Sequence, residues 1–100
     1  MIICDNAFEG CTSLSSLVIP DSVTSIGIGA FEYCSALSSL VIPDGVTSIG
    51  DSTFSDCRSL SEIVIPSSIT SIGDKAFQFC NFPNDLKQEL ISRFGEKIFG

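Results

Sequence analysis

The chain has 100 residues, of which 44% are hydrophobic and 17% are charged, and its formal net charge at pH 7 is −7. This composition predicts one domain with an apolar core and excludes a disordered chain. No apolar run approaches the roughly 18 residues of a membrane-crossing helix. Residues 1–10 lack the basic and long apolar regions of a secretory signal peptide, so we expect none in this chain.

The acidic residues are concentrated in the first 80 residues, which hold nine acids and two bases, whereas residues 81–100 hold three of each. An acidic surface repels phosphate groups, so nucleic acid and anionic membranes are disfavoured as partners. Two interpretations of the charge remain: it serves solubility alone, or it attracts a basic partner.

A segment of 23 residues occurs three times and ends each time in glycine. The copies are residues 5–27, 28–50 and 51–73, and a fourth begins at 74–80. A fixed period of this length is typical of leucine-rich-repeat-like solenoids, in which each turn buries its apolar side chains against neighbouring turns. Residues 1–80 are therefore predicted to form a repeat solenoid with three full turns and partial turns at its ends.

Within each copy, the segment SLVIP or EIVIP is predicted to be a short parallel strand, because it is β-branched and ends in proline. The spacing L-x-x-L-x-L directs three apolar side chains inward per copy: Leu14, Leu17 and Ile19; Leu37, Leu40 and Ile42; Leu60, Ile63 and Ile65. The following segment, PDSVTSIG in the first copy, turns the chain and allows a second short strand. We expect the closing glycines where φ is positive or where two backbones come close: Gly27, Gly50 and Gly73.

The segments AFEGC, AFEYC, TFSDC and AFQFC are predicted to be tight 3-10 or short helical turns. Their aromatic rings recur at one position of the repeat, so we expect them to stack into a ladder: Phe8, Phe31, Phe54 and Phe77.

The full pattern A-F-x-x-C-x-x-L-x-x-[LI]-V-I-P-x-x-[VI]-T-x-I-G resembles the BspA-like, or Treponema-type, leucine-rich repeat over residues 1–80. The resemblance implies a curved right-handed solenoid. It also implies a protein of bacterial surfaces, or of some protists, that binds host or matrix proteins and other cells. The implied location is the cell surface or the extracellular space, while a cytoplasmic location stays open because this chain shows no signal peptide.

Four of the five cysteines share one position of the repeat: Cys11, Cys34, Cys57 and Cys80. Parallel stacking brings equivalent Cα atoms within reach of a disulfide, about 4.7–4.9 Å apart, but directs all the thiols toward the core. We expect buried, reduced thiols rather than a disulfide or a metal site, because the chain has no histidine and no C-x-x-C pair. Cys4 is expected to be the reactive thiol.

The sequence favours no catalytic site. It has no histidine, no G-x-S-x-G motif and no glycine-rich phosphate loop. The carboxylate pairs Asp5 with Glu9 and Asp51 with Asp56 are expected to be solvated. We therefore predict a protein that is not an enzyme and uses no cofactor or metal.

Residues 81–100 leave the repeat and are predicted to form an amphipathic helix with its N-cap at Asn84 or Asp85. Its apolar face comprises Leu86, Leu90, Ile91, Phe94 and Ile98, and Gly95 is expected to weaken its last turn. We expect this helix to cap the solenoid, since an open end exposes apolar side chains and strand edges. The alternative is a helix that binds a membrane or a partner protein. Its equal numbers of acids and bases disfavour membrane binding, for which a basic face is expected.

The x positions of L-x-x-L-x-L face outward and form the candidate partner-binding surface on the concave face. Three valines make a stripe, with serine or glutamate on one side and aspartate on the other: Ser16, Val18, Asp21, Ser39, Val41, Asp44, Glu62 and Val64. Pro20, Pro43 and Pro66 follow the valines. The alternative is that valine serves only strand formation and the stripe is too small to matter. If so, the variable convex positions become the candidates: Tyr33, Asp56 and Phe79.

Two functions remain open. The first is a protein-binding module for surface adhesion or protein–protein interaction. The second is a structural or self-associating segment of a longer repeat protein, or an intracellular scaffold. An N-terminal end without a cap predicts a homo-oligomer through residues 1–27 or docking onto preceding repeats. Ice binding by the ladder Thr24, Thr47 and Thr70 is a remote third option.

Overall fold

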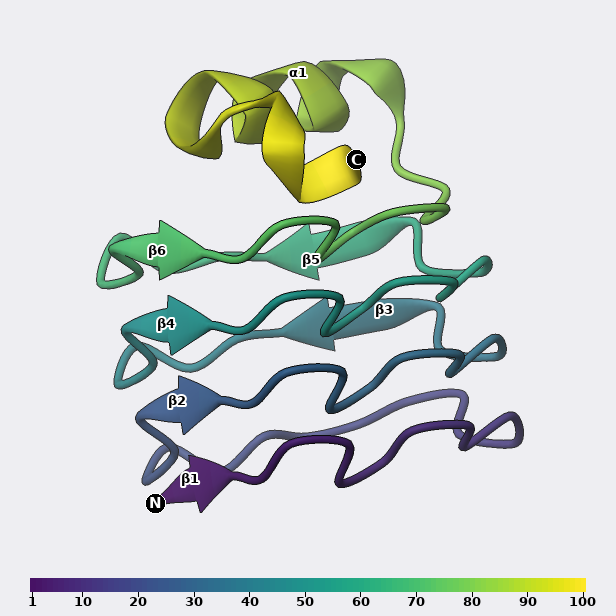
Figure 1. Ribbon diagram of the computed structural model, residues 1–100, viewed down its shortest axis with the longest axis vertical. Coiled ribbons are helices and arrows are strands. Elements are labelled where there is room, and N and C mark those ends of the chain that lie inside the picture. Colours follow the sequence, from purple (N-terminus) through teal and green to yellow (C-terminus); the bar gives the residue numbers. More distant parts are fainter.

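The computed structural model describes residues 1–100 as a stack of coils with a helical segment over one end (Figure 1). Each coil returns the chain to the same place one level higher. The stack contains six short strands: β1 (Ile2–Ile3), β2 (Ser25–Ile26), β3 (Ser39–Val41), β4 (Ser48–Ile49), β5 (Glu62–Val64) and β6 (Ser71–Ile72). An α-helix, α1 (Asn84–Phe94), and a 3-10 helix, η1 (Glu96–Phe99), follow.

The strands form two parallel sheets on opposite sides of each coil (Figure 1). One sheet has the order β1-β2-β4-β6, and the other pairs β3 with β5 and continues into the first full copy through the bridge Ser16↔Ser39. Every paired residue lies 23 positions from its partner, as in Ser25↔Ser48 and Leu40↔Ile63. The predicted parallel stacking of equivalent residues and the second short strand of each copy are confirmed.

The phenylalanine ladder is also confirmed. Neighbouring rings of Phe8, Phe31, Phe54 and Phe77 have centroids 5.2, 5.4 and 5.6 Å apart and planes within 3° of one another. The last three rings are fully buried. The ladder therefore runs through the stack as one continuous apolar column.

The turn that carries each phenylalanine is the tight turn that the sequence predicted, with bonds three residues back, and it does not continue into a helix. Successive N–H groups alternate between two acceptors: those of Ala7 and Glu9 donate three residues back, whereas those of Asn6, Phe8 and Gly10 donate to the next coil. A 3-10 helix needs consecutive N–H groups to bond within the segment. Since every second donor here joins two coils, the segment remains a series of tight turns.

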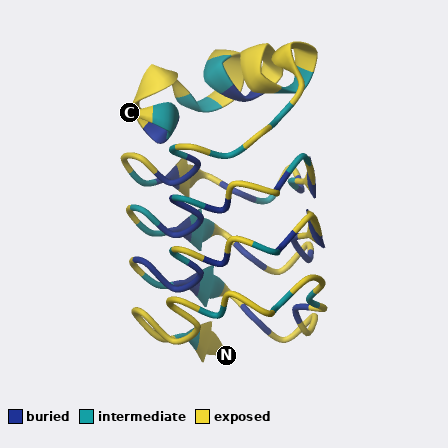
Figure 2. Ribbon diagram, turned by 90° about the vertical axis from the view of Figure 1, so that its right-hand side faces the viewer, coloured by how far each residue is buried: buried dark blue, intermediate teal, exposed yellow.

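A single apolar core fills the interior of the stack, and it comprises 21 buried residues. Leu37 and Leu60 are fully buried, as the L-x-x-L-x-L spacing predicted, whereas Leu14 and Leu17 are only half-buried. Figure 2 shows this gradient: the middle coils are lined by buried residues, and the coil nearest the N-terminus is largely exposed.

Close approach of backbones explains the glycine that closes each copy. A Cβ atom on Gly50 would lie 2.7 Å from the nitrogen of Ile28 and 2.8 Å from the carbonyl carbon of Gly27. Gly27 and Gly73 face the preceding coil in the same way. None of the three has a positive φ, so that alternative was wrong.

Positive φ occurs instead at two other positions of the repeat, in every turn. One set is Asn6, Gly29, Ser52 and Lys75, and the other is Gly10, Tyr33, Asp56 and Phe79. These residues flank the phenylalanine turn, and six of the eight are not glycine. A left-handed conformation costs such residues roughly 1–2 kcal/mol each, so the hydrogen bonds between coils have to hold this backbone in place.

The segment after the repeats differs from its prediction in two respects. The N-cap position is occupied by Pro83 rather than by Asn84 or Asp85, and Pro83 makes no side-chain capping bond. Within the first turn, the Leu86 N–H donates to the Asp85 carboxylate at 3.0 Å. It ends at Phe94 because Gly95 adopts φ 89°, so Ile98 belongs to η1 rather than to the last turn of α1. Gly95 thus does not weaken a continuing helix, as the sequence suggested, but separates two helices.

The short helix η1 lies where the next coil would be. Its Lys97 and Ile98 carbonyl oxygens accept the N–H groups of Lys75 and Phe77, both at 2.7 Å. In the other turns, the equivalent N–H groups donate to the following coil. On the basis of these bonds we propose the division into a solenoid over residues 1–80 and a capping segment over residues 81–100.

Candidate recognition surface

The strands β3 and β5 position the outward side chains of the predicted surface. In each strand the middle residue, Leu40 or Ile63, is buried, and the residues on either side are exposed. This alternation follows from the two-residue period of a strand, which sends neighbouring side chains to opposite faces. The valines therefore point outward: Val18 is 89% exposed, Val41 61% and Val64 59%.

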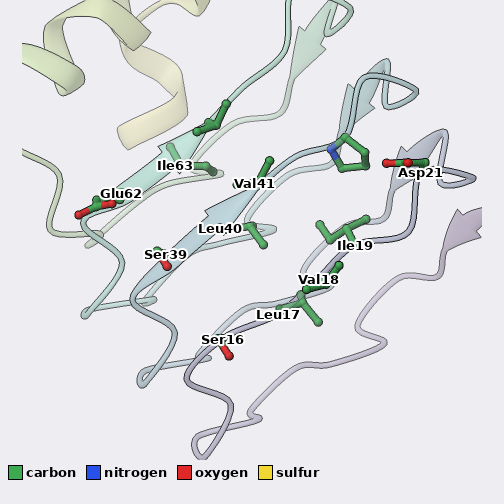
Figure 3. Close-up of a pocket in the computed structure, with 12 residues that line it drawn as sticks. Ser16, Leu17, Val18, Ile19, Asp21, Ser39, Leu40, Val41, Glu62 and Ile63 are labelled. Carbon is green, nitrogen blue, oxygen red and sulfur yellow. The ribbon is translucent and has the colours of Figure 1, made fainter.

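Seven of the eight predicted residues line one open hollow of about 400 Å³ over this sheet (Figure 3). We call it the valine hollow; from the prediction it contains Ser16, Val18, Asp21, Ser39, Val41, Glu62 and Val64. Asp44 is exposed but does not line it. The sequence missed the other lining residues, which come from the inward and proline positions: Leu17, Ile19, Leu40, Pro43 and Ile63.

The prolines that follow the valines do not form an exposed ladder. Pro43 and Pro66 are buried, whereas Pro20 is exposed. Pro20 belongs to the first full copy. One side of this copy faces the second copy, and its other side is covered only by the short segment that precedes Asp5. Exposure at this position thus depends on the neighbouring coil, which a pattern within one copy does not reveal.

The charged residues that line the valine hollow are both acidic. Its lining includes Asp21 and Glu62 and no lysine or arginine. In Figure 3, Glu62 and Asp21 lie at opposite ends of the surface, with Val18 and Val41 between them. The arrangement combines an apolar centre with an acidic group at each end.

A second group of exposed side chains lies at the phenylalanine turns, on the positions suggested as the alternative surface. Tyr33 is 51% exposed and Phe79 is 56% exposed, while Asp56 is half-buried. Arg58 neutralises part of this region, because its guanidinium donates to the Asp56 carboxylate at 2.8 Å and lies 5.2 Å from the centre of the Phe79 ring. None of the four main hollows of the surface unites the three residues.

Acidic side chains also meet near Glu32. Burial raises the pKa of the Glu32 carboxyl, and the adjacent Glu9 carboxylate raises it further. Nothing at this position pairs the two charges with a base, since Arg58 bonds to Asp56. The pair is therefore a source of local repulsion.

The cysteines of the repeat are partly as predicted. Cys34 and Cys57 are buried, but Cys11 and Cys80 are only half-buried because they belong to the two ends of the stack. Three of the thiols donate to a phenylalanine carbonyl of the preceding coil at 3.2 Å: Cys34 to Phe8, Cys57 to Phe31 and Cys80 to Phe54. All five cysteines are free, and Cys4 is exposed.

Burial raises the pKa of the Cys57 thiol to about 12, and the neighbouring Cys34 thiol contributes to the rise. Burial also raises the pKa values of Cys34 and Cys80. A thiol needs to ionise to act as a nucleophile or a metal ligand, so these side chains behave as small apolar groups. No group of three or more cysteines and acids is placed to hold a metal ion.

The two ends of the stack differ. At the C-terminal end, Phe82 and Phe99 cover Phe77, with ring centres 5.5 and 6.1 Å away. At the N-terminal end, Met1 and Ile2 are exposed by 62% and 64%, and Phe8 by 39%. The helices of the chain lack the length and apolar character that a membrane crossing needs.

Comparisons with known proteins agree with this architecture. A family model described as the BspA type leucine rich repeat region matches residues 1–100, with 6 copies. A leucine-rich repeat protein from Bacteroides ovatus has a similar crystal structure, with 37% identity and a TM-score of 0.78 over 96% of this chain. A T. pallidum leucine-rich repeat protein shows 28% identity and a TM-score of 0.64 over 91% of this chain.

The chain is much shorter than these two structures. It spans 26% of the Bacteroides ovatus chain and 54% of the T. pallidum chain. No curated protein matches it.

Proposed function

Because this chain belongs to the BspA type leucine-rich repeat family, we propose that it is a non-enzymatic protein-binding module that recognises its partner through the valine hollow. The observation that carries the proposal is the row of exposed valines over one open hollow, with acidic side chains at both ends. Exposed apolar patches with polar rims mark interaction sites more often than isolated apolar residues do.

The finer proposal is adhesion at the cell surface, with a host, matrix or cell-surface protein as the partner. It rests on the family to which the chain belongs, and an adhesive role suits a rigid stack that presents the same side chains at regular intervals. We propose a location on the cell surface or outside the cell on the same basis; an intracellular scaffold is the alternative.

A specific pair of substitutions tests the role of the hollow. Val41→Lys places a charge in the centre of the surface without touching the core, since Val41 is exposed. Ile28→Lys is the matched control, because Ile28 is a similarly exposed aliphatic residue, at 52%, and does not line the valine hollow. Both variants should keep their melting temperature within a few degrees of the wild type.

The assay is binding of the three proteins to immobilised, purified matrix proteins. Val41→Lys should weaken binding by at least about tenfold, because a lysine in an apolar contact has to be desolvated, and Ile28→Lys should have little effect. Equal loss in both variants, or no loss in either, argues against recognition through the valine hollow. Loss of folding in Val41→Lys shows that the side chain faces inward.

The second candidate function is self-association through the N-terminal end. The specific observation is that Met1, Ile2 and Phe8 are exposed there, while the other end of the same core is covered by Phe82 and Phe99. Edge strand β1 also has a neighbour on one side only. Sedimentation at several protein concentrations tests it: Ile2→Lys should shift an oligomer toward the monomer, and a monomer at all concentrations excludes the idea.

A further inference from the structure

The acidic groups of the valine hollow lack local partners. Neither Asp21 nor Glu62 forms an ion pair; the two ion pairs of the chain join Arg58 to Asp56 and Lys97 to Asp74. One cation borders this face, Arg93 on α1, but its guanidinium donates to the Pro66 carbonyl at 3.5 Å and lies 4.9 Å from the Phe94 ring. Both carboxylates are therefore free to attract charge from outside the chain.

The distance between the two acidic ends follows from the regular geometry of the stack. Glu62 and Asp21 lie two coils apart and five positions apart along the repeat. With about 4.8 Å between coils and about 3.3 Å per extended residue, the diagonal is roughly 19 Å. An extended segment of about six residues covers this distance.

The centre of this diagonal is apolar. Val18 and Val41 lie between the acidic ends in Figure 3, and the floor beneath them is formed by buried or half-buried aliphatic side chains. An occupant gains from apolar contact in its middle and from positive charge at its ends. A segment with acidic ends and a charged centre would place carboxylates beside Asp21 and Glu62 and charged groups against the valines.

We propose that the occupant of the valine hollow is an extended protein segment with an apolar centre and two basic side chains about six residues apart. This inference rests on the proposed function and specifies its partner by chemistry. The overall charge supports it, because the full net charge of −7 lies on the solenoid and steers basic segments toward it. The side chains at the two ends then fix the register of the segment along the hollow.

Synthetic peptides provide the test. The probe is the capped peptide Lys-Thr-Val-Pro-Val-Thr-Lys, and the comparison peptides carry glutamate or glutamine in place of both lysines. Each is titrated into the isotope-labelled full chain, and amide chemical shifts report where it binds. We expect the lysine peptide to shift residues of the valine hollow and to bind about tenfold more tightly than the glutamate peptide, because each exposed charge pair contributes modestly.

Protein variants separate local attraction from the overall field. Glu62→Gln and Asp21→Asn should each weaken the lysine peptide about threefold. Glu9→Gln is the control, since it removes the same charge from an exposed residue outside the hollow. If Glu9→Gln weakens binding as much as Glu62→Gln does, the attraction belongs to the whole surface and the proposal is overturned.

The remaining outcomes distinguish this inference from the proposed function. Equal binding of all three peptides at the valine hollow overturns the basic-segment proposal and leaves recognition by the hollow intact. If no peptide shifts the residues of the hollow, the basic-segment proposal is overturned as well. The proposed function then depends only on the Val41→Lys and Ile28→Lys comparison with matrix proteins.

Discussion

The glycine that closes each copy offers a direct test of how tightly the coils stack. We predict that Gly50→Ala destabilises the chain by about 3 kcal/mol, because its Cβ would lie 2.7 Å from the Ile28 nitrogen and 2.8 Å from the Gly27 carbonyl carbon. Those atoms are backbone, so relief requires the two coils to separate. Separation also weakens the bond from the Gly50 N–H to the Ile26 carbonyl, which is 2.9 Å long.

A second glycine supplies the control. A Cβ atom added to Gly10 would have no other atom within 4 Å, but Gly10 adopts φ +75°. Gly10→Ala therefore tests the backbone conformation without a steric clash, and it should destabilise the chain by about 1 kcal/mol. Urea unfolding followed by circular dichroism measures both variants. In a chain of 100 residues, a loss of about 3 kcal/mol lowers the melting temperature by about 12–24 °C. If Gly50→Ala is as mild as Gly10→Ala, close approach does not explain the glycine.

Four further results are expected. Ile28→Asn should stabilise the chain by about 1 kcal/mol. The Asp51 N–H has no hydrogen-bond partner, and the asparagine side-chain oxygen can accept it, just as the Asp5 carboxylate accepts the Ile28 N–H at 2.8 Å one coil earlier. An unchanged unfolding midpoint would contradict this. Ile98→Ala should cost 2–5 kcal/mol, since this fully buried side chain joins η1 to the core, and a neutral result would show that η1 does not cap the stack. In native buffer a bulky thiol reagent should label Cys4 quickly and Cys57 hardly at all, and equal rates would refute burial. The Cys57 pKa rises to about 12 in the folded chain, whereas the pKa of an unfolded thiol is about 8.5. The free energy of unfolding should therefore fall as the pH rises between these two values. Cys57→Ala should make this pH dependence less steep.

The stacking of the coils could be predicted because the repeat is nearly constant. Residues 23 positions apart have the same chemistry, so the phenylalanine column and the paired strands follow from placing like residues together. The exposure of Val41 likewise follows from alternation along a strand whose neighbour, Leu40, belongs in the core. In these cases the local preference and the packing between coils agree.

The errors arose where contacts between coils override local preference. The same contacts limit the predicted phenylalanine turn to a single tight turn, because the Phe8 N–H bonds to Ala30 of the next coil. Gly95 was placed inside a helix because apolar residues recur on both sides of it. Its positive φ instead allows Ile98 to reach the core, and that geometry depends on the position of the last coil.

The candidate surface was predictable in its residues but not in its shape. The outward positions follow from the repeat, yet the hollow also needs Leu17, Ile19 and Leu40, which were assigned to the core. Whether an inward side chain stays partly accessible depends on the spacing of adjacent coils. A pattern within a single copy contains no information about that spacing.

Cys4 extends the glycine argument to the N-terminal end of the stack. It occupies the repeat position of Gly27, Gly50 and Gly73, where each Cβ would point at the backbone of the preceding coil. At Gly27, that atom would lie 2.6 Å from the Asp5 nitrogen and 2.8 Å from the Cys4 carbonyl carbon. A coil stacked on this end in the same register would meet the Cys4 side chain at similar distances. A neighbour at this end, whether a preceding segment or a second copy, therefore has to approach with a different register or a wider spacing.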